Sequence, residues 1–204
     1  MSRKQNPYAG PDPRTLEAKK RGYPARSVFK LEEIQEKTQL FRGGQHVLDL
    51  GAAPGSWSLY ASQKVGPSGR VLAIDLSEIS QRFPPHVTVV QGDAFDVTND
   101  LLAAHGPYDI VLSDMAPRTS GVKFQDQAQS FELFVRALEV AKQFGKPETS
   151  AFVAKIFMGP EFNEAIALCK AAYKKSRVIR PAGTRPNSKE TFIVGQGLRP
   201  PASP

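Results

Sequence analysis

Four charged residues of this chain are of types that could carry acid–base chemistry: Lys30, Asp114, Lys155 and Glu190. Lys155 stands out, because it interrupts the apolar run 152–157 and a lysine is rarely buried without a partner. An ammonium buried beside a second cation loses its proton more easily, and a neutral amine near pH 7 can serve as a general base. Asp114, taken alone, could equally cap a helix or a turn. These residue types favour removal of a proton from a hydroxyl if the fold brings them together.

The elements that must position these residues follow from the hydrophobic pattern. Short β-rich runs alternate with longer helical patterns, which predicts an α/β, Rossmann-like fold with a seven-stranded, mostly parallel sheet and helices on both faces. Residues 181–189 contain two prolines and a glycine, so we expect an antiparallel last strand rather than a crossover helix. The predicted strands are 46–50, 70–75, 87–91, 108–113, 150–157, 177–180 and 191–194, and the predicted helices are 27–37, 56–64, 98–104, 125–144 and 161–174.

A turn of small residues follows the first predicted strand. The sequence 47–57 runs from an apolar strand into a turn whose glycines, Gly51 and Gly55, let a ligand approach the backbone. Such a turn alone is weak, because dinucleotide folds and phosphate loops also contain one. Asp75 ends the second strand, where a carboxylate can accept both ribose hydroxyls of a nucleoside cofactor. Asp93 follows the third strand at the expected adenine edge, although a turn-forming role is nearly as well supported there.

Charge is distributed unevenly along the 204 residues, which we expect to form one domain. Residues 1–30 carry eight Lys/Arg and two acids, 31–169 carry eleven and seventeen, and 170–204 carry eight and one. Basic ends around an acidic middle indicate a protein that grips phosphates with both ends of its chain, although two solvated tails would give the same count. Residues 1–13 and 198–204 are rich in Pro, Gly and polar residues, and we expect them to be flexible unless RNA orders them.

Other functional classes receive little support. The lone Cys169 excludes an internal disulfide and suits core packing in a reducing, cytoplasmic protein. No apolar run approaches the roughly 20 residues of a membrane span, so we expect no membrane association. The three histidines, His46, His86 and His105, have no metal-ligand spacing, and we expect no metal.

Taken together, the motifs resemble the RrmJ/FtsJ family of S-adenosylmethionine-dependent ribose 2'-O-methyltransferases. The resemblance runs from Gly22 to Val194 and rests on 25–31, 49–57, 91–93, 113–121, 155–157 and 188–194. It implies a class I methyltransferase fold and a catalytic tetrad of Lys30, Asp114, Lys155 and Glu190. In bacterial members the implied target is a uridine 2'-hydroxyl in the A-loop of 23S rRNA within the large ribosomal subunit. The predicted cofactor-binding residues are Gly51, Ala52, Pro54, Gly55, Trp57, Asp75, Asp93, Ala94 and Asp114.

Within this resemblance the tetrad residues have distinct expected roles. Lys155 is the base, and Lys30 lowers its proton affinity and holds the nucleotide. Asp114 orients the amine and the methyl donor, while Glu190 fixes the lysines. Three local departures leave the tetrad untouched: Ser56 replaces a common glycine, 76–78 replaces a proline-containing segment, and 186–187 replaces commoner basic residues.

Three alternatives compete with ribosomal RNA ribose methylation. A base-modifying methyltransferase would more naturally carry an Asn/Asp-Pro-Pro-aromatic turn than the 114–117 sequence Asp-Met-Ala-Pro. A tRNA ribose methyltransferase would share the tetrad, and the absence of extra domains favours rRNA only weakly. A non-catalytic ribosome-assembly factor that binds RNA would need none of the four tetrad residues. We expect a monomer whose partner is RNA.

Overall fold

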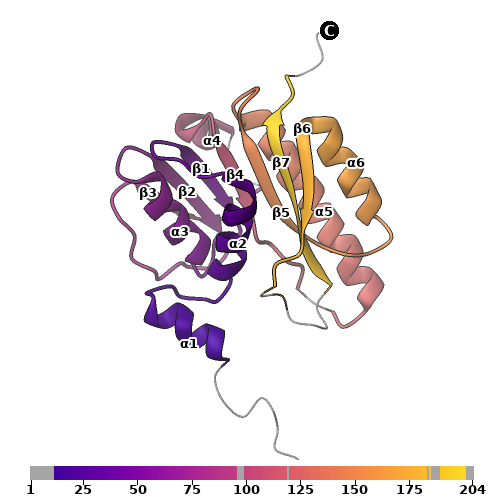
Figure 1. Ribbon diagram of the computed structural model, residues 1–204, viewed down its shortest axis with the longest axis horizontal. Helices are drawn as coiled ribbons and strands as arrows, with labels where there is room; N and C mark the ends of the chain where they lie inside the picture. The colour runs from indigo at the N-terminus through magenta and orange to yellow at the C-terminus, as the bar shows by residue number, and fades with distance from the viewer. Residues whose placement is uncertain (1–11, 96–98, 119, 183, 185–188, 201–204) are drawn as a thin grey trace, which may run out of the picture.

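A seven-stranded sheet runs through the computed structural model, which describes residues 12–95, 99–118, 120–182, 184 and 189–200 (Figure 1). The strands are β1 (His46–Leu50), β2 (Arg70–Asp75), β3 (Val87–Gln91), β4 (Ile110–Ser113), β5 (Ala151–Phe157), β6 (Tyr173–Ile179) and β7 (Glu190–Leu198). The helices are α1 (Pro13–Lys20), α2 (Val28–Thr38), α3 (Ser56–Val65), α4 (Asn99–His105), α5 (Lys123–Phe144) and α6 (Phe162–Ala172).

The strand order is β3-β2-β1-β4-β5-β7-β6. Strands β1 to β5 pair in parallel, whereas β7 lies between β5 and β6 and is antiparallel to both. The predicted mostly parallel sheet with an antiparallel last strand is confirmed. Because β1, β4 and β5 all run the same way, the residues at their carboxyl ends share one edge of the sheet, where open α/β sheets bind ligands.

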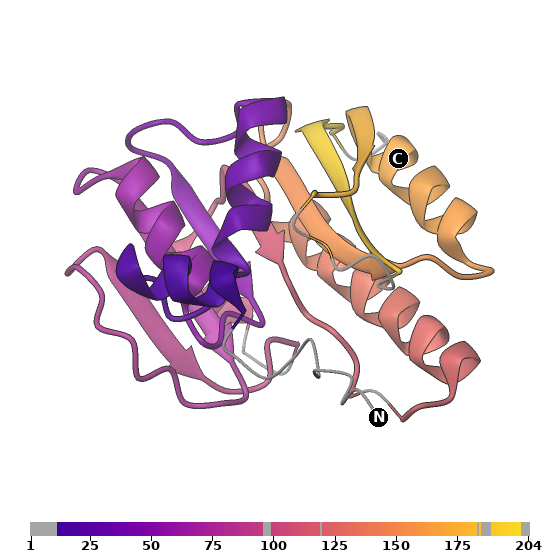
Figure 2. The same ribbon diagram turned by 60° about the horizontal axis from the view of Figure 1, so that its bottom comes forward.

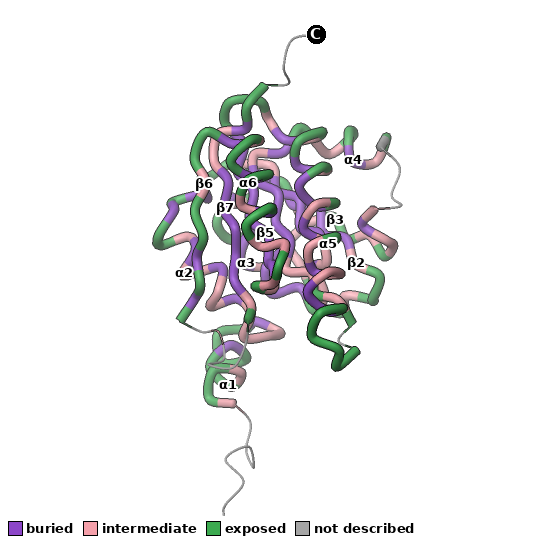
Figure 3. The backbone as a smooth tube through the Cα atoms, turned by 90° about the vertical axis from the view of Figure 1, so that its right-hand side faces the viewer, coloured by how far each residue is buried: buried purple, intermediate pink, exposed green. Residues whose placement is uncertain are grey.

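Each face of the sheet is covered by helices, as Figure 2 shows. Side chains of successive strand residues point to opposite faces, so Val47 packs in the cluster under α2 and α3, and Leu48 packs in the cluster under α5 and α6. The inner strands are the most continuously buried part of the chain, whereas the edge strands β3 and β6 are largely exposed or half-buried. Figure 3 shows α1 at one end of the molecule with little buried surface. No helix in the described ranges is both long and apolar enough to cross a bilayer.

The predicted boundary between the last helix and strand was wrong. The helix predicted to reach residue 174 ends at Ala172, and the strand predicted at 177–180 begins at Tyr173 and ends at Ile179. Tyr173 is fully buried, stacks on Phe152 with ring centroids 6.1 Å apart and pairs with Leu198. Tertiary packing of this aromatic ring therefore overrides the helical pattern.

Strand β7 is longer than the predicted 191–194, because it is paired on both sides. A Cβ atom on Gly195 would lie 2.5 Å from the Tyr173 ring, so this glycine marks a close approach rather than a strand end. Helix α1 was not predicted from the sequence. Parts of the predicted tails lie outside the described residues, but Asp12 caps α1 and Leu198 is buried at the end of β7.

Candidate active site and methyl-donor pocket

Two ion pairs gather the four tetrad residues at the carboxyl edge of the sheet. Asp114 follows β4, and its Oδ1 lies 3.0 Å from Nζ of Lys155, near the end of β5. The same ammonium also donates a hydrogen bond to the Asp114 backbone carbonyl. Nζ of Lys30, on α2, lies 2.6 Å from Oε1 of Glu190, the first residue of β7. Segments far apart in sequence therefore supply the predicted tetrad.

The pairing of β5 with β7 places the two ion pairs side by side. Glu190 lies opposite Phe157 and Phe192 lies opposite Lys155, and directly opposed residues of antiparallel strands present their side chains on the same face. The Phe192 ring centroid is 6.0 Å from Nζ of Lys30. Phe192 thus lies between Lys155 and Lys30.

All four tetrad side chains are largely removed from solvent. The exposed fraction is 8% for Lys155, 18% for Asp114, 14% for Lys30 and 13% for Glu190. Charges in such a site interact more strongly than they would in water. Each lysine is held by a carboxylate, and this fixes where its nitrogen points.

The position of Lys30 depends on the segment that precedes α2. Ser56 Oγ accepts a hydrogen bond from Ala25 N at 2.8 Å and lies 3.1 Å from Ala25 O, to which it donates. The indole N–H of Trp57 donates to Ser27 O at 2.9 Å. The first turn of α3 therefore holds the start of α2. The departure from glycine at Ser56 supplies one of these anchors.

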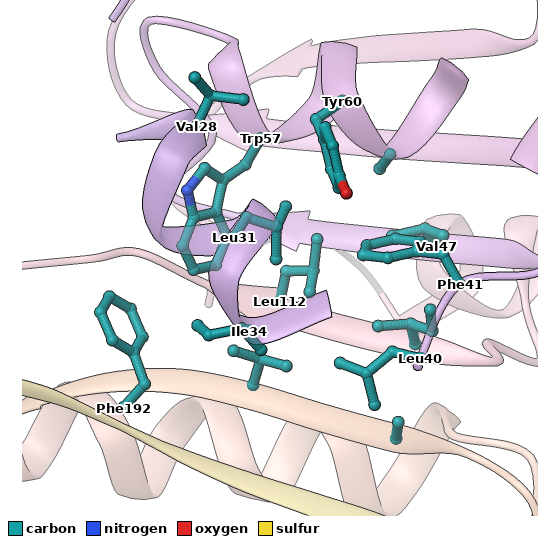
Figure 4. Packing of buried hydrophobic residues seen from close by; sticks show 14 of the residues in the cluster. Val28, Leu31, Ile34, Leu40, Phe41, Val47, Trp57, Tyr60, Leu112 and Phe192 are labelled. Carbon is teal, nitrogen blue, oxygen red and sulfur yellow. The ribbon is translucent and has the colours of Figure 1, made fainter. Parts of the chain in front are cut away.

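Figure 4 shows the buried apolar side chains that pack around the start of α2. Trp57 lies above Phe192 and near Leu31 and Ile34. The Trp57 and Phe192 ring centroids are 5.6 Å apart. Leu31 and Ile34 are fully buried on the same face of α2, three residues apart. This packing fixes α2 over the sheet, and Lys30 projects from its first turn.

A cavity of about 370 Å³ opens beside Asp114. Five of the residues predicted to bind the donor line it: Gly51, Asp75, Asp93, Ala94 and Asp114. It is further lined by Ala53, Leu76, Ser77, Phe95, Met115, Ala116, Arg118, Leu133 and Arg136. The cavity lies at the carboxyl edges of β1, β2 and β4, and Asp114 belongs both to it and to the tetrad.

Backbone hydrogen bonds hold the acids of this cavity. Asp75 Oδ2 accepts from Ala53 N at 2.9 Å and Oδ1 accepts from Ser77 N at 2.8 Å. Asp93 Oδ1 accepts from Phe95 N at 2.9 Å, so the turn-forming role considered for Asp93 is present together with its place in the cavity wall. Each carboxylate oxygen keeps a further lone pair for a ligand hydroxyl or amine.

The other predicted donor-binding residues lie elsewhere in the turn. Gly55 packs against the 79–83 segment, because a Cβ there would meet Phe83 at 2.8 Å. Trp57 faces Phe192 and Ser27. Ala52 hydrogen-bonds to Ile74 O, and the Ala53-Pro54 peptide bond is cis. These residues shape the turn and anchor α2.

Asp49 is a residue that the sequence did not single out. It is fully buried, accepts a hydrogen bond from Ser58 Oγ at 2.5 Å, and its Oδ1 has no hydrogen-bond partner within the described part of the chain. Its pKa is raised to about 7, mainly by burial and also by the negative charges of Asp114 and Asp75, while the Ser58 hydrogen bond acts in the opposite direction. A carboxylate inside the apolar run 47–50 was the available signal, the same one that revealed Lys155.

A larger cavity, of about 810 Å³, lies at the opposite edge of the sheet. Its lining includes Phe144, Pro147 and Leu198, near the amino ends of β4 and β5. None of the tetrad residues lines it, and of the two cavities we assign the smaller to the chemistry because it contains Asp114.

Comparison with known proteins agrees with this geometry. The sequence model of the FtsJ-like methyltransferases matches residues 23–198, which include the tetrad, the cavity and all seven strands. This chain belongs to the FtsJ-like methyltransferase family.

Curated relatives in this family are similar over nearly their whole length. The chain is 56% identical over 191 residues to the ribosomal RNA large subunit methyltransferase E of Sorangium cellulosum, covering 94% of this chain and 90% of that protein. It is 50% identical to the protein of the same name from Nitratidesulfovibrio vulgaris, covering 90% and 92%.

A solved structure of a ribosomal RNA methyltransferase from Plasmodium falciparum shares the FtsJ-like fold. It superposes with a TM-score of 0.73 at 22% identity, covering 86% of this chain and 98% of that one. At this identity the likeness supports the fold alone.

Proposed function

We propose that this FtsJ-like methyltransferase transfers a methyl group from S-adenosylmethionine to a ribose 2'-hydroxyl of 23S rRNA, at a uridine of the A-loop in the large ribosomal subunit. The observation that carries the proposal is the double position of Asp114, which lines the cavity and pairs with Lys155. A hydroxyl that reaches Lys155 thereby lies beside the wall of the donor pocket. The names of the relatives support the choice of large-subunit rRNA.

In this proposal the protein positions the hydroxyl and removes its proton. S-adenosylmethionine supplies a methyl group on a positively charged sulfur when bound. Lys155 is the proposed acceptor of the 2'-hydroxyl proton, and Asp114 orients its nitrogen through the carboxylate and the backbone carbonyl. Lys30 holds the nucleotide, and Glu190 holds Lys30. The cavity acids Asp75 and Asp93 are the proposed partners of the donor's ribose and adenine.

The proposed function also implies a cellular compartment and an oligomeric state. The protein acts in the cytoplasm, as a monomer, on a substrate presented by the ribosome. The free thiol of Cys169 is fully buried in the core, which suits a reducing compartment.

The test compares two lysine–aspartate pairs at opposite ends of the same two strands. Lys155→Ala removes the proposed base, whereas Lys146→Ala breaks the Lys146–Asp109 pair, 2.8 Å long, at the amino ends of β4 and β5. We expect Lys155→Ala to lower kcat on unmethylated large subunits by about 10²- to 10⁴-fold, with the Kd for S-adenosylmethionine within a few-fold of wild type. Lys146→Ala should retain full kcat. Normal ribose methylation by Lys155→Ala would overturn the assignment of the base.

The target is tested separately by mapping 2'-O-methyl groups in RNA from cells that lack the protein. We expect the A-loop uridine of 23S rRNA to lose its methyl group. Loss confined to a tRNA would establish the tRNA enzyme instead. Wild-type protein that binds RNA but methylates none would establish a non-catalytic assembly factor.

A further inference from the structure

The first turn of α5 lies against Met158 and Gly159, which follow β5, and Met158 in turn contacts Lys189. Gln127 donates a side-chain hydrogen bond to Met158 O, and Met158 N donates to Lys189 O at 2.9 Å. A Cβ on Gly159 would lie 2.9 Å from Gln127, which shows how closely the helix approaches this loop. Because Lys189 immediately precedes Glu190, this surface is continuous with the Lys30–Glu190 pair.

Two lysines meet on that surface. Lys123 is the first residue of α5, one turn before Gln127, and its side chain contacts that of Lys189. The pKa of Lys189 lies below its ordinary value, first because of this side-chain contact and further because the charges are alike. Among the described residues neither lysine forms a salt bridge with a carboxylate. Two exposed ammonium groups brought close by the packing of α5 near Lys189 attract an anion from outside the chain.

Exposed apolar side chains surround the lysine pair. Phe124 is 64% exposed, Val122 is 58% exposed and Met158 is 41% exposed. Phe124 is the one exposed large aromatic residue in the parts of the chain that the structure describes. Single-stranded nucleic acids are bound by cations that contact phosphates and by aromatic rings on which bases stack. The exposed Phe124 ring and the two neighbouring lysines, which form no salt bridge within the described residues, are the groups that such binding requires.

We propose that Lys123, Lys189 and Phe124 form an RNA-binding rim, in which the lysines bracket a phosphate next to the target nucleotide and Phe124 stacks on an unpaired base. The inference rests on the proposed function, since it places the rim beside the ribose that Lys155 deprotonates. Neither Lys123 nor Phe124 lies in a motif that carried the resemblance or in the donor cavity.

The first test measures binding of a fluorescently labelled, single-stranded RNA of the A-loop sequence at several salt concentrations. Lys123→Ala and Lys189→Ala should each weaken binding and flatten the slope of log K against log[salt] by about 0.7. Lys189→Arg should restore the slope, because the positive charge is retained. The control is Lys142→Ala, which removes an exposed lysine at the other end of α5 and should leave affinity and slope unchanged.

The second test separates stacking from charge. Phe124→Ala and Phe124→Leu should each weaken RNA binding by roughly tenfold without changing the salt slope, because a leucine fills space but offers no aromatic face. All rim variants should keep the wild-type Kd for S-adenosylmethionine and the wild-type kcat at saturating large subunits. Their effect should appear in KM for the RNA substrate.

The outcomes distinguish the rim from the proposed function. If the rim variants bind RNA as tightly as Lys142→Ala does and the wild-type protein methylates rRNA, the rim does not bind RNA, and the proposed function is retained. If the rim variants lose RNA affinity as expected but the wild-type protein methylates no ribose, the proposed methyltransferase function is wrong, and the RNA-binding role of the rim is retained. Tightened RNA binding on removal of either lysine would also overturn the rim.

Discussion

Phe192 lies directly opposite Lys155 in the antiparallel pairing of β5 and β7. Its ring is also 6.0 Å from the Lys30 ammonium and 5.6 Å from the Trp57 ring. One buried aromatic side chain thus links the two lysines to the core that fixes α2. The geometry of the tetrad therefore depends on apolar packing as well as on its ion pairs.

Phe192→Leu should lower kcat by more than its loss of stability accounts for. The smaller side chain leaves room next to both lysines and removes the contact with Trp57, at a cost of about 1–2 kcal/mol in the free energy of unfolding. Phe152→Leu is the matched control, because Phe152 is equally buried in β5 but packs on the opposite face. We expect a similar fall in Tm for both variants and a fall in kcat for Phe192→Leu alone. Equal kcat values in the two variants would contradict this role.

Ser56→Ala should loosen the start of α2. The variant loses two hydrogen bonds to Ala25, worth about 1–3 kcal/mol together, and Lys30 loses part of its support. Ser62→Ala, in the same helix, removes only a hydrogen bond to Leu59 O. Steady-state kinetics with large subunits should show a lower kcat for Ser56→Ala at unchanged donor Kd, and wild-type kcat for Ser62→Ala. Unaltered kinetics in Ser56→Ala would show that Trp57 alone suffices.

Gly51→Ala should impair donor binding. Gly51 has φ of +74°, and a Cβ there would lie 2.2 Å from Cγ of Met115, so the Met115 side chain, which lines the cavity, must move. Gly66→Ala provides the control, because Gly66 has a similar φ of +67° with nothing within 4 Å of the added atom. Both variants bear backbone strain of about 1–3 kcal/mol, because alanine is disfavoured at these positive φ values. Calorimetric titration with S-adenosylmethionine should show at least a tenfold weaker Kd for Gly51→Ala only.

Asp49→Asn should stabilise the protein at neutral and higher pH. The Asp49 pKa is about 7 in the folded protein because of burial, against roughly 4 in the unfolded chain. The folded state therefore binds the proton more tightly, and wild-type stability falls as pH rises from about 4 to about 7 and then levels off. Asparagine mimics the protonated acid, so its advantage grows over the same interval to on the order of 4 kcal/mol.

Denaturant unfolding of wild type and Asp49→Asn at pH 4.5, 6 and 8 measures this difference. Asp109→Asn is a control with a carboxylate that is paired with Lys146 and hydrogen-bonded to His46 N. That control should be destabilised rather than stabilised at pH 8. A constant difference between wild type and Asp49→Asn across the pH range would show that Asp49 is ionised throughout.

Much of the fold was predictable because local patterns agree with the tertiary structure. β1, β2 and β3 match the predicted strands residue for residue, since their apolar runs are bounded by turns. The end of α6 and the length of β7 were not predictable, because they depend on Tyr173 packing beside Gly195. No local propensity contains that contact between separate segments.

The candidate site was likewise only partly predictable from the sequence. Lys155 was identifiable as a charge in an apolar strand, and Asp75 as an acid at a strand end. The orientation of Trp57 toward Phe192 instead of the cavity depends on a ring contact between residues of α3 and β7, which are far apart in the sequence. The contact between Lys123 and Lys189 was equally hidden, because it depends on where α5 begins relative to β7. The sequence did not reveal which side chains from separate segments contact one another.

The position of β7 also determines when the predicted tetrad can assemble during synthesis. β7 is translated after β5 and β6, yet it must lie between them. A growing chain that stops before residue 190 has Lys155, Asp114 and the donor cavity but neither Glu190 nor Phe192. The four residues of the predicted tetrad therefore come together only after β7 has inserted between β5 and β6.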